Sequence, residues 1–142
     1  MSKGYVSATL RRLVYDRAKG CCEYCGLPEV AVLVSHEIDH VIAEKHGGST
    51  DKDNLAIACT SCNKHKGSDL ASIDPVSGAI VRLYQPRCDR WTEHFQFQAG
   101  EIIPLSAIGR VTVRLLQLNR STRVSIRRLL AEAEVWKAPP ST

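Results

Sequence analysis

The sequence predicts an α+β fold: a small unit braced by a metal ion, with a helix before it and a helical extension after it. Two CxxC pairs, Cys22–Cys25 and Cys59–Cys62, flank short strand-like segments and can hold one metal ion between them. Serines that suit helix N-caps precede helical patterns at both ends of the chain. The 142 residues, 44% of them hydrophobic, suit one domain, or one small domain with an extension.

The N-terminal region is expected to form one helix that packs on the core. Residues 1–6 are predicted to be loose, Ser7 is a suitable N-cap, and Gly20 lies just past the predicted end at Lys19. The helical spacing of apolar side chains predicts a packing stripe formed by Leu10, Leu13 and Val14. Arg11, Arg12 and Arg17 lie off this stripe. A helix that packs on the core is the favoured interpretation, and contact of these arginines with DNA is the alternative.

Two short strands and a helix are expected between the first cysteine pair and residue 72. Residues 30–34 are apolar and rich in β-branched side chains, which predicts a strand that can continue to residue 42. Residues 46–51 have the composition of a loop, and residues 55–58 predict a second strand. A helix is expected from about Cys62 to about Leu70.

The second half of the chain predicts short strands and then two helices. Residues 74–78 predict a turn and residues 79–84 a strand, whereas residues 87–97 carry aromatic and charged side chains without a clear pattern. Those aromatics are expected to complete the core of the metal-binding unit, which is too small to bury much by itself. The predicted boundaries are 1–20 for the first helix, 21–72 for the metal-binding domain, 73–138 for the extension and 139–142 for a tail.

Helical spacing of apolar residues recurs in the extension, where Ser106 can cap one helix and Ser121 another that ends near Trp136. The two helices are expected to pack on each other, and they could instead form a dimer face. The chain is therefore predicted to be a monomer or a homodimer.

The six cysteines favour metal binding over disulfides. No N-terminal apolar run resembles a signal peptide and no apolar stretch is long enough to span a membrane, so a cytoplasmic, reducing location is expected. Structural zinc held by the two CxxC pairs is the prediction, and the 33 residues between Cys25 and Cys59 exceed the roughly 15 to 20 of a common zinc ribbon. Cys21 is an alternative to Cys22 with a less usual spacing, and Cys88 is expected to be buried.

Polar residues beside the cysteines suit a second, harder metal and a general base. Asp39-His40, Asn54 and Asn63 supply a carboxylate, an imidazole and amides, and carboxylate and amide oxygens suit Mg²⁺ or Mn²⁺. Neutral imidazole can take a proton from water near neutral pH. Successive residues on a regular strand point to opposite faces, so the strand is expected to end or bulge at Asp39 and His40. Lys66, three residues after Asn63, is expected to meet a phosphate, or else to be a solvated lysine.

These residues, taken in order with Gly47-Gly48, Asn54-Leu55 and the run from Cys59 to Gly67, resemble the HNH endonuclease family. The resemblance covers about residues 20 to 70 and implies a ββα-metal finger: a hairpin, a loop and a helix that bind a divalent ion beside a phosphodiester. It implies that His40 is the general base, that Asp39 is a metal ligand, and that Asn54 fixes the loop and the orientation of His40. Asn63 occupies the third slot, which is often His in the family, and is implied as a second metal ligand.

The remaining histidines and one glutamate are less strongly indicated as site residues. His36 and Glu37 are candidates to support the metal site from nearby positions, and His65 is expected to be exposed or to touch DNA. No role is assigned to His46 or His94.

The net charge of +4 is compatible with nucleic acid, and six arginines without an acidic neighbour lie between Arg110 and Arg128. Phosphate contact is the favoured interpretation for this stretch, with Arg110, Arg114 and Lys66 as the candidate residues, and a solvated helix face is the alternative. The sequence therefore predicts a metal-dependent endonuclease that hydrolyses double-stranded DNA and leaves, by the resemblance, 5′-phosphate and 3′-hydroxyl ends. The alternatives are a non-catalytic zinc-finger module that binds DNA or RNA, and a protein-interaction zinc domain.

Overall fold

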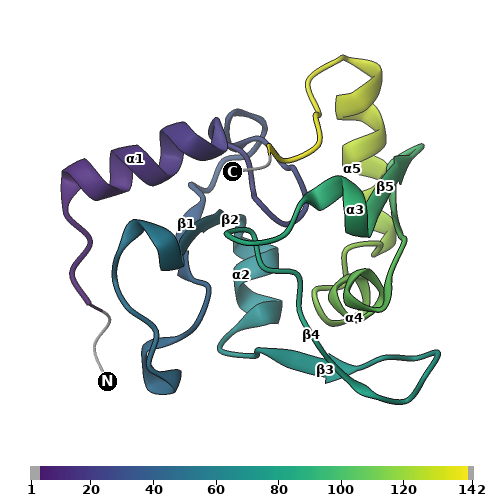
Figure 1. Ribbon diagram of the computed structural model, residues 1–142. Helices are drawn as coiled ribbons and strands as arrows, with labels where there is room; N and C mark the ends of the chain where they lie inside the picture. Colours follow the sequence, from purple (N-terminus) through teal and green to yellow (C-terminus); the bar gives the residue numbers. More distant parts are fainter. Residues whose placement is uncertain (1–3, 141–142) are drawn as a thin grey trace.

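The computed structural model describes residues 4–140, so the predictions for residues 1–3 and for residues 141–142 of the tail lie outside the described residues. The chain folds into short helices and three antiparallel two-stranded hairpins, as the α+β prediction requires (Figure 1). α1 lies on one side of the central hairpin and helices α3 to α5 on the other. Within residues 4–140, no helix is both long and apolar enough to cross a membrane.

Helix α1 (Ala8–Ala18) begins and ends where its capping residues predict. Ser7 Oγ accepts a hydrogen bond from the Leu10 amide at 3.1 Å, and Lys19 adopts the left-handed conformation that ends the helix. The apolar face of α1 buries Val14 and Ala18 against the central hairpin.

The central unit is a hairpin followed by a helix. β1 (Glu37–His40) pairs with β2 (Leu55–Ala58) in a regular antiparallel register that runs from Glu37 opposite Ala58 to His40 opposite Leu55. α2 (Thr60–Lys66) follows directly and packs on both strands. This is the ββα arrangement that the family resemblance implies, although α2 is shorter than predicted because Gly67 ends it.

The strand predicted at residues 30–34 is wrong. Glu29–Ala31 forms a single 3₁₀ turn after Pro28, and the following side chains face solvent, with Leu33 fully exposed. A strand needs a pairing partner, and β2 is paired with β1 along one edge and hydrogen-bonded to Glu23 through Ile57 on the other. The prediction of a buried Cys88 is also wrong, because this cysteine is exposed.

The second half of the chain shares a core with the metal-binding unit. β3 (Ala71–Ile73) and β4 (Ile80–Arg82) form a hairpin across the predicted turn, and α4 (Ala107–Leu115) starts at its Ser106 cap as predicted. α5 (Ser121–Glu132) begins one residue early, without a serine cap, and ends before Trp136. The elements that the sequence left unassigned or missed are β3, α3 (Trp91–His94), β5 (Phe95–Gln98) and β6 (Glu101–Pro104).

The aromatic side chains of this second half pack on the cysteines, as expected. One buried cluster contains the four CxxC cysteines together with Trp91, Phe95 and Trp136. Trp91 Nε1 also donates a hydrogen bond to the Tyr24 carbonyl at 2.9 Å, which fixes the indole against the turn between the first two cysteines.

Candidate functional site

The structure brings the thiols of Cys22, Cys25, Cys59 and Cys62 together. All four sulfur atoms lie within 4.8 Å of one another, and Cys25 Sγ is 3.7 Å from Cys59 Sγ. Four thiolates at about 2.3 Å from one tetrahedral zinc ion would be about 3.8 Å apart, so the cluster fits a zinc site with four cysteine ligands. Cys21 lies outside the cluster, and its thiol contacts the Lys19 carbonyl.

Local backbone geometry positions the cysteines. Cys59 is the N-cap of α2, and the Cys62 amide donates to its sulfur at 3.4 Å. Gly26 closes the turn after Cys25 with a positive φ of 79°, and a Cβ there would lie 2.6 Å from the Trp136 ring nitrogen, so no other residue fits without movement. Trp136 Nε1 in turn donates to the Cys25 carbonyl at 3.0 Å.

An arginine from the extension contacts the thiol cluster. Arg123 of α5 places Nη2 at 3.0 Å from Cys62 Sγ and at 3.8 Å from Cys59 Sγ. Burial lowers the pKa of Arg123, but the neighbouring thiolates raise it by more, so this pKa lies above its ordinary value. The guanidinium is therefore a fixed positive charge beside the cysteine cluster, where it would balance part of the excess negative charge of a zinc ion held by four thiolates.

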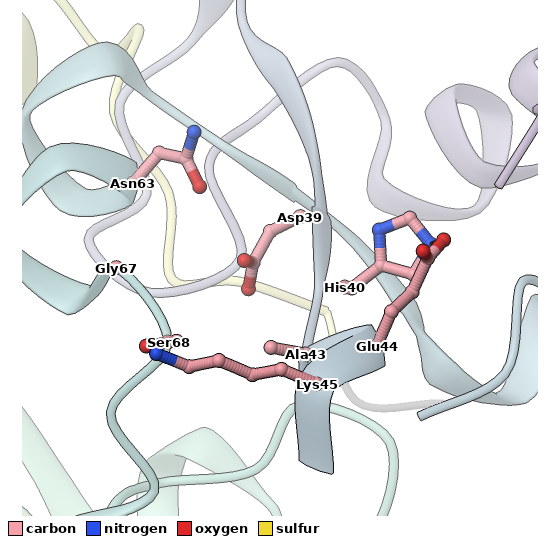
Figure 2. Close-up of a pocket in the computed structure, with 8 residues that line it drawn as sticks. All are labelled: Asp39, His40, Ala43, Glu44, Lys45, Asn63, Gly67 and Ser68. Atoms are coloured by element: carbon pink, nitrogen blue, oxygen red, sulfur yellow. Dashed lines mark ion pairs between the residues drawn. The ribbon is translucent and has the colours of Figure 1, made fainter. Parts of the chain in front are cut away.

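A second polar cluster surrounds a hollow of about 470 Å³ at the end of β1 (Figure 2). Its lining consists of Asp39, His40, Ala43, Glu44, Lys45, Asn63, Gly67 and Ser68. Three of the four residues that the sequence predicts for catalysis thus line one surface. The fourth, Asn54, does not line it and makes hydrogen bonds to the loop that follows His40.

Asp39 is held by two buried donors. The Tyr24 hydroxyl donates to Asp39 Oδ2 at 2.8 Å, and Lys66 Nζ lies 3.2 Å from the same oxygen. Burial, followed by the nearby carboxylate, raises the pKa of Tyr24 well above its ordinary value, so the phenol keeps its proton and remains a donor. A carboxylate oxygen is also a ligand that suits a hard divalent ion.

Lys66 does not occupy the exposed position that either sequence interpretation requires. Its side chain is 2% exposed, and Nζ donates to the Val41 carbonyl at 2.9 Å as well as contacting Asp39. A contact to the His40 carbonyl at 3.4 Å completes its surroundings. The ammonium group therefore ties α2 to the end of β1, and the expectation of a solvated lysine is wrong.

His40 is fixed through one ring nitrogen. Nε2 lies 2.9 Å from Thr50 Oγ1 and 3.4 Å from Glu44 Oε1, whereas Nδ1 is buried and has no hydrogen-bond partner within residues 4–140. β1 ends at His40, as the sequence argument requires, without a bulge in its pairing. Asp39 and His40 lie on opposite sides of the strand, and the hollow around its end reaches both (Figure 2).

Glu44 and Thr50 were not foreseen as partners of His40. Both lie in the loop between β1 and β2, where no helical or strand period indicates which side chains face the histidine. Thr50 Oγ1 also donates to Glu44 Oε1 at 3.3 Å, and the Gly4 amide donates to the same oxygen, so the carboxylate is held from several sides.

Asn54 ties this loop together. Its side-chain oxygen accepts from the Ile42 amide at 2.9 Å, and its amide nitrogen donates to the carbonyls of Ile42 and Ser49 at 2.9 and 2.8 Å. Gly48 allows this close packing, because a Cβ there would overlap the Ile42 carbonyl oxygen. Asn54 thus shapes the loop that follows His40, which is the geometry that the predicted role needs.

Asn63 on α2 presents an oxygen to Asp39. Its Nδ2 donates to Glu37 Oε2 at 3.2 Å, and Figure 2 shows its oxygen facing the Asp39 carboxylate. Two oxygen ligands on one hollow fit a hard divalent ion such as Mg²⁺ or Mn²⁺. Glu37 therefore acts on the candidate metal site through Asn63.

The other histidines are engaged elsewhere and do not line this hollow. Their ring nitrogens contact backbone carbonyls or a hydroxyl: His36 at Leu27, His46 at Ser68, His65 at Ser61 and His94 at Ser106.

The arginines between residues 110 and 128 do not form one basic surface. Arg110 makes a two-pronged ion pair with the buried carboxylate of Asp74 at 2.8 and 2.9 Å, and these bonds hold the pKa of Asp74 well below its ordinary range. Arg127 is buried against the Gly100 carbonyl, and Arg123 contacts the thiols. Arg114 remains exposed, so its contact with nucleic acid stays a prediction.

Comparison with known proteins gives one match, to the segment that contains the cysteine cluster and the polar hollow. No curated protein and no solved structure gives a match to the chain. Residues 22–69, about a third of the chain, match the family model described as HNH endonuclease. This segment holds the four clustered cysteines, the hairpin and helix α2. Residues 22–69 are therefore similar to HNH endonucleases, and their hairpin, helix and cysteine cluster are consistent with a ββα-metal fold.

Proposed function

We propose that this protein is a metal-dependent endonuclease that hydrolyses phosphodiester bonds in DNA. The observation that carries the proposal is the coincidence of the HNH match at residues 22–69 with one hollow lined by Asp39, His40 and Asn63. An imidazole and two oxygen ligands on one surface are what hydrolysis of a phosphodiester by activated water requires.

His40 is assigned as the general base that acts through Nδ1. Thr50 and the Glu44 carboxylate surround Nε2, which favours the tautomer with its proton on Nε2 and leaves Nδ1 as the acceptor. Nδ1 takes a proton from water while the water oxygen bonds to phosphorus. The bond from phosphorus to the 3′ oxygen breaks, and that oxygen leaves as a hydroxyl after it takes a proton from a second water molecule. The products carry 5′-phosphate and 3′-hydroxyl ends.

Asp39 and Asn63 are assigned as the residues that hold Mg²⁺ or Mn²⁺. When bound there, such an ion would supply positive charge that polarises the scissile phosphate and stabilises the leaving oxygen. Lys66 and Tyr24 fix the Asp39 carboxylate from the protein side, and Glu37 fixes the Asn63 amide, so the two oxygens are oriented toward the hollow. Zinc in the cysteine cluster is assigned a structural role, because all four cysteines are buried and leave no open position for a substrate.

A second candidate is a non-catalytic zinc-finger module that binds DNA or RNA. The observation in its favour is the ion pair between Lys66 and Asp39, which gives the carboxylate a positive partner without a divalent ion. In that function the polar cluster would serve the fold alone.

Cleavage of supercoiled plasmid tests the proposal. Wild-type protein is compared with His40→Ala and with His65→Ala, which removes an imidazole outside the hollow, in the presence and absence of Mg²⁺ or Mn²⁺. Zinc content is measured in each sample, so that loss of the structural metal is not mistaken for loss of the catalytic one. We expect nicked or linear product that depends on added metal, with wild type and His65→Ala only.

Full activity of His40→Ala would overturn the assignment of the base. DNA binding without cleavage by any zinc-loaded protein would favour the non-catalytic module.

A further inference from the structure

A second hollow lies on the other flank of His40. It measures about 500 Å³ and is lined by residues of the N-terminal segment, of α1, and of β1 and the position before it. The lining comprises Gly4, Tyr5, Val6, Arg11, His36, Glu37, Ile38 and His40. His40 lines both hollows, so they meet at the proposed catalytic base.

Each hollow has one lysine or arginine in its lining. Lys45 lines the first hollow and Arg11 the second, and both side chains are exposed. Neither charged group makes a hydrogen bond or an ion pair within residues 4–140. They differ in this from Lys66 and Arg110, whose charges are satisfied internally. A free cation beside a hollow is available for an anionic ligand.

The acidic side chains in the two linings are already engaged. Glu37 accepts from Asn63, and Glu44 accepts from Thr50 and from the Gly4 amide. These carboxylates still repel a phosphate, which makes the two free cations the groups that determine where the ligand's charge can lie.

We propose that one strand of the nucleic-acid backbone crosses the end of β1 over His40, with a phosphate against Arg11 on one side and another against Lys45 on the other. This inference rests on the proposed function, because it places the scissile phosphate between the two contacts. Each hollow is of a size that accommodates a nucleotide-sized ligand. The exposed Tyr5 ring at the second hollow adds a surface on which a base can stack.

The test is the salt dependence of binding to a labelled DNA duplex, measured by fluorescence anisotropy without added Mg²⁺ or Mn²⁺. Each phosphate contact contributes a slope of about 0.9 in log affinity against log salt for duplex DNA. We expect Arg11→Gln and Lys45→Gln each to reduce the slope by about this amount, and the double variant to reduce it by about twice as much. Raising salt fourfold should then weaken the binding of each single variant about 3.5-fold less than that of wild type.

Matched controls lie outside both hollows. Arg12→Gln removes the neighbouring exposed arginine of α1, and Lys137→Gln removes an exposed lysine. Both controls should keep the wild-type slope. All four substituted side chains are exposed, so the zinc content and melting temperature should stay at wild-type values. The proposed path of the backbone over His40, with its phosphate contacts at Arg11 and Lys45, is called the track. It would be overturned by equal slopes for Arg11→Gln and Arg12→Gln, or for Lys45→Gln and Lys137→Gln.

Failure of the track and failure of the proposed function give different results. Cleavage by wild type with no loss of slope in either hollow variant overturns the track alone. Loss of slope in both variants without cleavage by wild type supports the track and overturns the nuclease. Absence of binding by wild type to duplex and to single-stranded DNA overturns both.

Discussion

Lys66 gives the most quantitative prediction, because its charge is buried with a single acidic partner. Lys66→Met keeps most of the side-chain volume and removes the ammonium group. The Asp39 carboxylate, 4% exposed, then loses its ion pair, and the Val41 carbonyl loses a donor at 2.9 Å. Breaking a buried pair costs about 3 to 5 kcal/mol and an unsatisfied carbonyl about 1 to 3 kcal/mol. Because Tyr24 still donates to Asp39, we expect a loss near the lower end, about 4 kcal/mol.

Urea unfolding followed by tryptophan fluorescence measures this loss, with free zinc buffered at one concentration throughout. For a slope near 2 kcal/mol per molar urea, the midpoint should fall by about 2 M. Lys64→Met, an exposed neighbour on α2, should change stability by less than about 0.5 kcal/mol. Adding Asp39→Asn to Lys66→Met should recover part of the loss, because the second change removes the buried carboxylate charge that the ammonium group of Lys66 had balanced. If Lys66→Met is as stable as Lys64→Met, the buried ion pair does not exist in solution.

Four further changes follow from the contacts described above. Cys59→Ala should abolish stoichiometric zinc binding, measured by metal analysis, and the cooperative unfolding transition, measured by circular dichroism. A folded, zinc-free protein would contradict the structural role of zinc. Asn54→Ala removes three hydrogen bonds from the loop and should lower the free energy of unfolding in urea by about 3 kcal/mol. The same variant should lose plasmid cleavage. Arg123→Gln should lower zinc affinity about 10- to 100-fold in competition with a chelator, and unchanged affinity would show that the thiolates do not need the guanidinium. Arg110→Gln should lower the urea midpoint by an amount that is constant from pH 8 to pH 5. The pKa of Asp74 is depressed in the folded state, so the ion pair stabilises the fold fully above the ordinary value of 3.8 and loses its effect as the pH falls below that value. A difference in midpoint that grows in acid would be inconsistent with the ion pair.

Features that depend on neighbouring residues in the sequence were predictable. Ser7 and Ser106 mark helix starts because a hydroxyl caps the amides of the next turn, a local interaction. The cysteine pairs were predictable for a similar reason, since metal ligands need particular side chains at fixed spacing. The strand predicted at residues 55–58 is confirmed as β2, whereas the apolar run at residues 30–34 is not a strand, because such a run forms a strand only if a partner edge is free.

Features that depend on distant pairing were not predictable. Arg110 meets Asp74 across 36 positions, and Arg123 meets Cys62 across 61, so a run of arginines without acidic neighbours in sequence still has partners in space. Lys66 was misjudged in the same way, because its partners Asp39 and Val41 lie on another element. Helical spacing placed it on the same side as Asn63 but could not show that this side is covered.

The two contacts that Arg123 and Trp136 make with the cysteine turns have a consequence for biosynthesis. A ribosome makes the HNH segment first; the guanidinium that neutralises the thiolates follows Cys62 by 61 residues, and the indole that covers the first turn follows Cys25 by 111. Until then the nascent finger carries its thiolates without their counter-charge and without the ring that closes over Gly26. The cysteine site therefore reaches its observed surroundings only after Arg123 and Trp136 have been synthesised.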